Sequence, residues 1–191
     1  MLDLLWWKNL SPAWKQAFNE IFLLHNNEPA LNELEQIYNA PALRFAGPSA
    51  PFPNMSIELT DLSGITGLAN LEILIAVHHQ IRSLEELSKM KGLKKLFLYN
   101  SQLHSLAGIE GLSDLEQLYV QCNKIDSIKP VKTLVNLREF YIHDNNISSL
   151  DGLTEEHADK LEMFVCKPND QIKQKEMLRI ERELGIRCRG N

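Results

Sequence analysis

The chain has 191 residues, of which 44% are hydrophobic, so it can bury the core of one domain or one repeat array. Its formal net charge of −5 argues against a phosphate-binding surface, and we expect no nucleic-acid partner. The longest apolar run, Ile73–Val77, is too short to span a membrane, and we expect no membrane association.

Residues 1–39 predict a helical N-terminal cap. Ser11 is a suitable N-cap, and Pro12 suits the first position of a helix. Apolar residues at helical spacing follow, namely Trp14, Phe18, Ile21 and Phe22. A second helix is expected to begin near Asn27–Pro29, with an inward face of Leu31, Leu34, Ile37 and Tyr38. We interpret the three early tryptophans as part of the buried cap rather than as an exposed docking site.

From residue 40 to residue 169 the chain repeats, most clearly with a step of 22 residues. The regular units are 71–92, 93–114 and 115–136. In each unit, positions 1, 4, 6, 11, 14, 17 and 20 are apolar, so all 21 positions match. Chance agreement is on the order of 10⁻⁶ after allowing for the choice of register. The periodicity therefore predicts one stacked array with a continuous core.

The remaining units depart from this regular form. Unit 40–70 is degenerate, and we expect an insertion of about nine residues near Gly47–Ser56, whose prolines favour an extended surface loop. Its P-x-x-P sequence is the alternative, a ligand for a proline-binding domain. Unit 137–160 carries two extra residues and places Ala158 in its last apolar position, and unit 161–169 is partial.

The repeated pattern L-x-x-L-x-L-x-x-N resembles the leucine-rich repeat family, in its 22-residue class. The stretch W-W-x-x-L-S-P-x-W-K also resembles the helical N-terminal extension of some bacterial members. The resemblance implies an α/β repeat fold: a right-handed solenoid with a parallel sheet on its concave face and a helical cap at each end. It also implies a role in protein interaction. Strands are expected near 42–46, 73–77, 95–99, 117–121, 139–143 and 163–166.

Position 9 of each repeat is expected to hold an asparagine that bonds to backbone groups in the turn after the strand. Asn123, Asn145 and Asn169 fit this expectation, whereas His79 and Ser101 replace the asparagine. We therefore predict a weaker hydrogen-bond ladder in the first two regular repeats.

Residues 170–191 predict a C-terminal cap. A helix is expected over 170–184, and its inward residues are Ile172, Met177, Ile180 and Leu184. Gly185 is expected to end this helix, and 186–189 to add a short edge strand.

No motif of a known catalytic or cofactor site is present, so we expect neither enzymatic activity nor a cofactor. The pair His78 and His79 lacks further ligands at metal-binding spacing, and we expect no metal site. Cys166 occupies core position 6 and is expected to be an inert buried thiol, whereas Cys122 at position 8 is expected to be partly exposed. An odd number of cysteines favours reduced thiols and a cytoplasmic protein. The segment Met1–Lys8 lacks a basic start, which argues against a signal peptide.

Positions 3, 5 and 7 of each strand are expected to face away from the core, on the concave side. Solvated sheet faces usually carry polar residues there, but this chain places aromatic ones. We predict that the following residues bind a partner: Ile75, Phe97, Tyr99, Tyr119, Gln121, Tyr141, His143, Lys95 and Glu139. The alternative is cross-strand stacking that only stabilises the sheet.

These features predict a monomeric, non-enzymatic module that binds a protein or peptide through its concave face. A secreted or surface adhesin of the same fold is the alternative. A concealed catalytic site has the weakest support, because no base, nucleophile and orienting acid share neighbouring positions.

Overall fold

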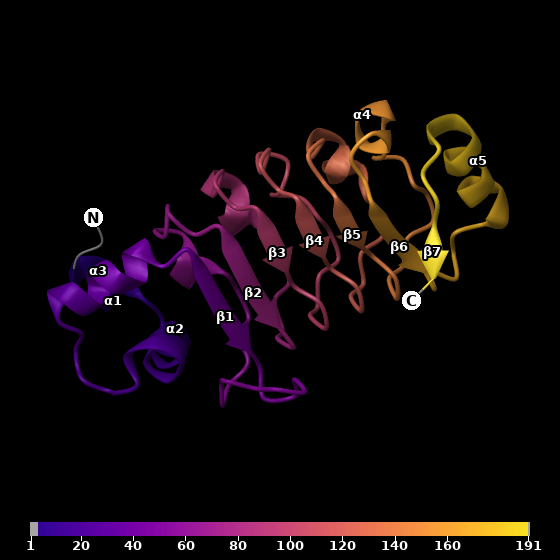
Figure 1. Cartoon of the computed structure of the whole chain (residues 1–191). Helices are drawn as coiled ribbons and strands as arrows, with labels where there is room; N and C mark the ends of the chain where they lie inside the picture. Colours follow the sequence, from indigo (N-terminus) through magenta and orange to yellow (C-terminus); the bar gives the residue numbers. More distant parts are fainter. Residues whose placement is uncertain (1–3, 191) are drawn as a thin grey trace.

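The computed structural model describes residues 4–190 and contains one open sheet of seven parallel strands, ordered β1 to β7 along the chain (Figure 1). The strands are β1 Ala42–Ala46, β2 Ile73–Val77, β3 Lys95–Phe97, β4 Gln117–Tyr119, β5 Glu139–Tyr141, β6 Met163–Lys167 and β7 Arg189–Gly190. Residues 22 positions apart are partners in the regular part, so Leu74 lies beside Leu96 and Leu96 beside Leu118. The parallel array predicted from the repeat is confirmed.

Strands β3, β4 and β5 end two residues earlier than predicted. The ladder nevertheless continues past them, because the Leu98 N–H donates to the Tyr119 carbonyl at 2.8 Å. The extended run ends at position 8, where the backbone is left-handed, with φ between 53° and 58°. This position is held by His78, Asn100, Cys122 and Asp144. Their side chains form a row, in which Asn100 Nδ2 lies 3.2 Å from His78 Nε2.

The core runs the length of the array, and none of the 21 apolar positions of the three regular repeats is more than 6% exposed. The returning segments contain short helical turns: η2 Ser63–Ile65, η3 Glu85–Lys89, η4 Lys129–Thr133 and α4 Glu155–Ala158. The prediction for Ala158 was wrong. In α4 the neighbouring His157 turns inward instead, where its Nδ1 accepts the Thr154 N–H and its Nε2 lies 3.2 Å from the Val131 carbonyl.

The position-9 side chains join each repeat to the one before it. Asn123 Nδ2 donates to the carbonyls of Leu98 and Val120 at 2.9 and 3.0 Å, and its Oδ1 accepts the Leu103 N–H at 3.1 Å. His79 keeps the accepting role, because its Nδ1 accepts the Leu59 N–H at 3.1 Å. The Ser101 hydroxyl is buried and has no hydrogen-bond partner among residues 4–190. The ladder is therefore interrupted at Ser101 and partly retained at His79.

The N-terminal cap consists of α1 Leu4–Asn9, α2 Pro12–Phe18, the π-helical turn η1 Asn19–Leu23 and α3 Leu31–Asn39. Ser11 caps α2 as predicted, since its hydroxyl accepts the Trp14 N–H at 3.3 Å. Trp14 is fully buried with its ring centroid 5.2 Å from that of Phe45, and its Nε1 donates to Asp61 at 2.9 Å. The prediction for Leu31 was wrong, because it is the first residue of α3 and is exposed.

The insertion at Gly47–Ser56 covers the free edge of β1. Asn54 Oδ1 accepts the Ala46 N–H, and Asn54 Nδ2 donates to the Arg44 carbonyl, both at 2.7 Å. This side chain pairs with backbone groups that would otherwise form an open sheet edge. A Cβ at Gly47 would lie 1.9 Å from the His78 carbonyl oxygen, so only glycine allows this close approach. The expected surface loop therefore covers the open edge of strand β1.

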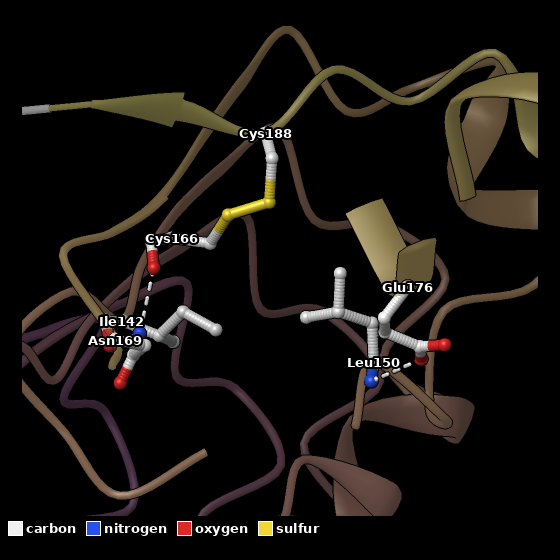
Figure 2. Close-up of a disulfide and its surroundings, with 6 residues drawn as sticks. All are labelled: Ile142, Leu150, Cys166, Asn169, Glu176 and Cys188. Carbon is white, nitrogen blue, oxygen red and sulfur yellow. Dashed lines mark hydrogen bonds between the residues drawn. A yellow bond between two sulfur atoms is a disulfide. The ribbon is translucent and has the colours of Figure 1, made fainter. Parts of the chain in front are cut away.

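The C-terminal cap contains α5 Gln174–Leu184, which begins later than predicted and ends at Gly185 with φ 70°. Cys166 is not a free thiol. Its Sγ is bonded to Cys188, because the chain after α5 returns beside β6 and places the two Cα atoms 5.6 Å apart (Figure 2). Glu176 also ties α5 to the array by accepting the Leu150 N–H at 2.8 Å (Figure 2). No helix within residues 4–190 is both long and apolar enough to cross a membrane.

The buried His79 predicts a pH-dependent stability. Burial lowers the pKa of His79 to about 4, and Glu58 opposes this shift while His78 adds to it. The unfolded histidine titrates near its ordinary pKa of about 6.5, so the unfolded chain binds more protons below that pH and stability falls as pH falls. Because of His79, the free energy of unfolding of the wild type should fall by about 2 kcal/mol between pH 7 and pH 5, and His79→Asn should not show this fall. Urea unfolding at both pH values measures it. Burial also lowers the pKa of His157, and its contribution to the pH dependence of stability is the same in the wild type and in the variant. An identical pH dependence in the variant would contradict this account.

The cap predicts a large cost for removing its central ring. Trp14→Ala should lower the free energy of unfolding by about 3–5 kcal/mol, because it opens a cavity beside Phe45 and removes the bond to Asp61. The matched control is Leu24→Ala, since Leu24 lies in the same cap and is exposed. Thermal unfolding of both variants checks the prediction, and equal melting temperatures would show that Trp14 does not close the core.

Candidate functional site

The open face of the sheet is the side opposite the core, formed by strand positions 3, 5 and 7. Strands β3, β4 and β5 alternate half-buried and buried residues, which places positions 3 and 5 on this face. The structure gathers the predicted residues into three rows, which are Ile75, Phe97, Tyr119 and Tyr141 at position 5, Tyr99, Gln121 and His143 at position 7, and Lys95 and Glu139 at position 3.

The position-5 row contains a continuous aromatic column. The ring centroids of Phe97 and Tyr119 are 4.6 Å apart with an interplanar angle of 29°. Those of Tyr119 and Tyr141 are 4.2 Å apart at 11°. Because the parallel register sets this stacking, each ring is fixed by its neighbours, and the rings offer a pre-ordered surface.

Glu139 holds the middle of the column in place. Its carboxylate accepts hydrogen bonds from the Tyr119 hydroxyl and, at 2.8 Å, from Gln117 Nε2. Desolvation and this hydrogen bond from the hydroxyl raise the pKa of Tyr119 above its ordinary value, so the phenol stays protonated. Glu139 therefore orients Tyr119 and does not act as a free charge at the rim.

His143 contributes little contact area to the open face. It is 5% exposed, and its Nδ1 lies 2.7 Å from Asp144 Oδ2. Tyr99, in the same row, is half-buried and contacts the His78 ring edge-on, with centroids 5.7 Å apart at 83°. Within residues 4–190, one group of three histidine, cysteine, aspartate or glutamate side chains is close enough to hold a metal ion. It consists of Cys122, His143 and Asp144.

The repeat pattern does not predict that the insertion closes one end of the open face. Ala50 from the insertion is buried with Ala46 and Val77, and Phe97 and Tyr99 pack against this cluster. Phe52 follows in the same loop and is 81% exposed. The insertion thus ends the aromatic surface over β1 and β2. The nine extra residues are the available sequence signal for it, but they do not show which way the loop folds.

Comparisons with known proteins agree with this architecture. The family described as leucine-rich repeats (2 copies) matches residues 91–133. No curated protein sequence matches the chain. An internalin, inlF, of Listeria monocytogenes is 21% identical over 78% of this chain and 40% of its own, with a TM-score of 0.63. Internalin C2 of the same organism is 25% identical over 72% and 55%, with a TM-score of 0.55.

A leucine-rich-repeat protein of Leptospira interrogans is 22% identical over 88% of this chain and 41% of its own, with a TM-score of 0.65. The chain spans about half or less of the length of these three structures. The repeated sequence, buried leucine core and parallel sheet of this chain are those of the leucine-rich-repeat fold, and the family model matches within them. The leucine-rich-repeat fold is a general protein-interaction module.

Proposed function

We propose that the chain is a non-enzymatic, monomeric interaction module that binds a segment of another protein on its open face. The observation that carries this proposal is the aromatic column of Phe97, Tyr119 and Tyr141. It lies half-buried on a face that no other element of residues 4–190 covers over β3 to β5 (Figure 1). Ordered aromatic side chains are typical binding hot spots, because little conformational entropy is lost when they are contacted.

The geometry also limits what such a partner contacts. Stacking covers the faces of the central Tyr119 ring, so the partner meets ring edges, which carry partial positive charge and favour carbonyl oxygens. The insertion, which packs through Ala50, ends the open face on one side. An extended peptide that crosses β3 to β5 and presents its carbonyl groups to the column fits this shape.

A photo-crosslinking experiment in the native cell tests this proposal. A photoreactive phenylalanine replaces Lys95, on the open face, in one protein and the exposed Ser88, on the outer side, in another. We expect a discrete crosslinked partner from the first protein and not from the second. Tyr119→Ala with Tyr141→Ala should abolish that product and weaken binding of the purified partner by about 30- to 1000-fold, which is about 2–4 kcal/mol.

A core variant is the control that separates binding from folding. Leu118→Ala opens a cavity in the core and should lower the free energy of unfolding by about 2–5 kcal/mol while leaving the open-face residues in place. The double tyrosine variant should cost less in folding than Leu118→Ala and more in affinity. A double variant that keeps full affinity would show that the open face is not the binding surface.

The disulfide supports a second candidate, a secreted or surface adhesin of the same fold. Cys166 is bonded to Cys188, and such bonds persist in oxidising compartments but are rare in the cytosol. The cytoplasmic location indicated by the odd number of cysteines stays a prediction, as does the absence of a signal peptide at Met1–Lys8, whose first three residues lie outside the described part.

Counting thiols in the native protein decides between the two locations. Cells are lysed in a denaturing buffer that contains an alkylating agent and no reductant, so that the buried Cys166 also reacts if it is a free thiol, and the modified cysteines are found by mass spectrometry. An exported protein should carry one alkylated cysteine, Cys122, because the other two form the disulfide. Three alkylated cysteines, with the protein in the cytosolic fraction, would contradict the adhesin proposal.

A further inference from the structure

We propose that Cys122, His143 and Asp144 bind one Zn²⁺ ion at the edge of the open face. Their candidate ligand atoms, Cys122 Sγ, a ring nitrogen of His143 and a carboxylate oxygen of Asp144, all lie within 4.8 Å of one another. The three residues follow two adjacent strands, β4 and β5, within three residues of their ends, and the register continues there because the Cys122 N–H donates to the His143 carbonyl at 3.1 Å. This proposal does not depend on the protein-binding role.

The distances suit tetrahedral coordination. Sγ of Cys122 is 3.9 Å from Asp144 Oδ2, and His143 Nδ1 is 2.7 Å from the same oxygen. With zinc bonds of about 2.0–2.3 Å, ligand atoms in a tetrahedron lie about 3.3–3.6 Å apart. Shifts of about half an ångström bring these two distances to the tetrahedral values. The third distance, from Cys122 Sγ to the ring nitrogen of His143, lies within 4.8 Å and closes by at most about 1.2 Å when all three atoms bind one ion.

The donor set selects the kind of ion. A thiolate, an imidazole nitrogen and a carboxylate are the three ligand types that Zn²⁺ takes, whereas Mg²⁺ and Ca²⁺ prefer oxygen alone. Cys122 binds as the thiolate, so coordination releases its proton. Three protein ligands leave a fourth position open, as in zinc sites that hold water or an external group.

The surroundings support an ion that remains accessible. The Asp144 side chain is 47% exposed, which provides an entry path, while the His143 ring is held in a buried position.

Titration with Co²⁺, followed by displacement with Zn²⁺, tests the site in the intact protein without reductant. The Cys166–Cys188 disulfide then leaves Cys122 as the single thiol. We expect one Co²⁺ per chain, visible light absorption typical of tetrahedral cobalt and a thiolate-to-cobalt charge-transfer band. One equivalent of Zn²⁺ should remove both signals.

Two variants keep the left-handed turn and remove a ligand. Cys122→Asn introduces the residue that Asn100 already places at this position with φ 53°, and Asp144→Asn keeps a residue that tolerates this backbone. Each should weaken Zn²⁺ binding at least tenfold, and Cys122→Asn should abolish the charge-transfer band. His104→Gln, which removes an exposed histidine elsewhere in the array, should bind as the wild type does.

Circular dichroism confirms that each variant is folded. Absence of stoichiometric Co²⁺ and Zn²⁺ binding in the wild type would overturn the proposal. A charge-transfer band that persists in Cys122→Asn, or equal affinity in all variants, would also overturn it.

Discussion

Except at Ser101, the side chain at position 9 bonds each repeat to the one before it, and the core and the surfaces of the array depend on this contact. Asn145 Nδ2 donates to the carbonyls of Val120 and Ile142, both at 3.0 Å, and its Oδ1 accepts the Ile125 N–H at 2.9 Å. One amide thus satisfies backbone groups of two repeats directly after the left-handed residue at position 8. This contact stabilises the turn after the strand and the pairing of neighbouring repeats.

A fixed register converts a sequence repeat into continuous surfaces. Leucines 22 residues apart form the core, and aromatic residues at the same step form the column on the open face. At position 2 the charges alternate in sign, which allows the exposed ion pairs Glu72–Lys94 at 3.0 Å and Arg138–Glu162 at 2.7 Å. Positions 3, 5 and 7 are not needed for the core or the turn and are free to vary, and the proposed binding surface lies there, whereas two of the proposed zinc ligands lie at position 8 of the turn.

The periodic part of the fold could be predicted from the sequence because each core position has the same neighbours in every repeat. Strands β1 and β2 have the predicted bounds, and Ser11 caps its helix as predicted. Non-periodic contacts could not be predicted. The inward turn of His157 depends on two extra residues in its repeat, and the path of the insertion depends on Asn54 pairing with β1.

Cys166 and Cys188 are 22 residues apart, and Cys122 is 21 residues from His143 and 22 residues from Asp144. Disulfide and metal motifs with short spacings do not contain these pairs. The 22-residue step of the repeat predicts that they lie side by side in neighbouring repeats.

The central claim is that position 9 holds the repeats together, and Ser101→Asn tests it most directly. Ser101 is buried and its hydroxyl lacks a partner among the described residues, whereas asparagine at the equivalent positions bonds to both repeats. The measurement is the free energy of unfolding by urea at pH 7. The substitution should raise it by about 1 kcal/mol, although most substitutions of buried residues destabilise. A decrease, or no change, would contradict the claim that this side chain couples neighbouring repeats.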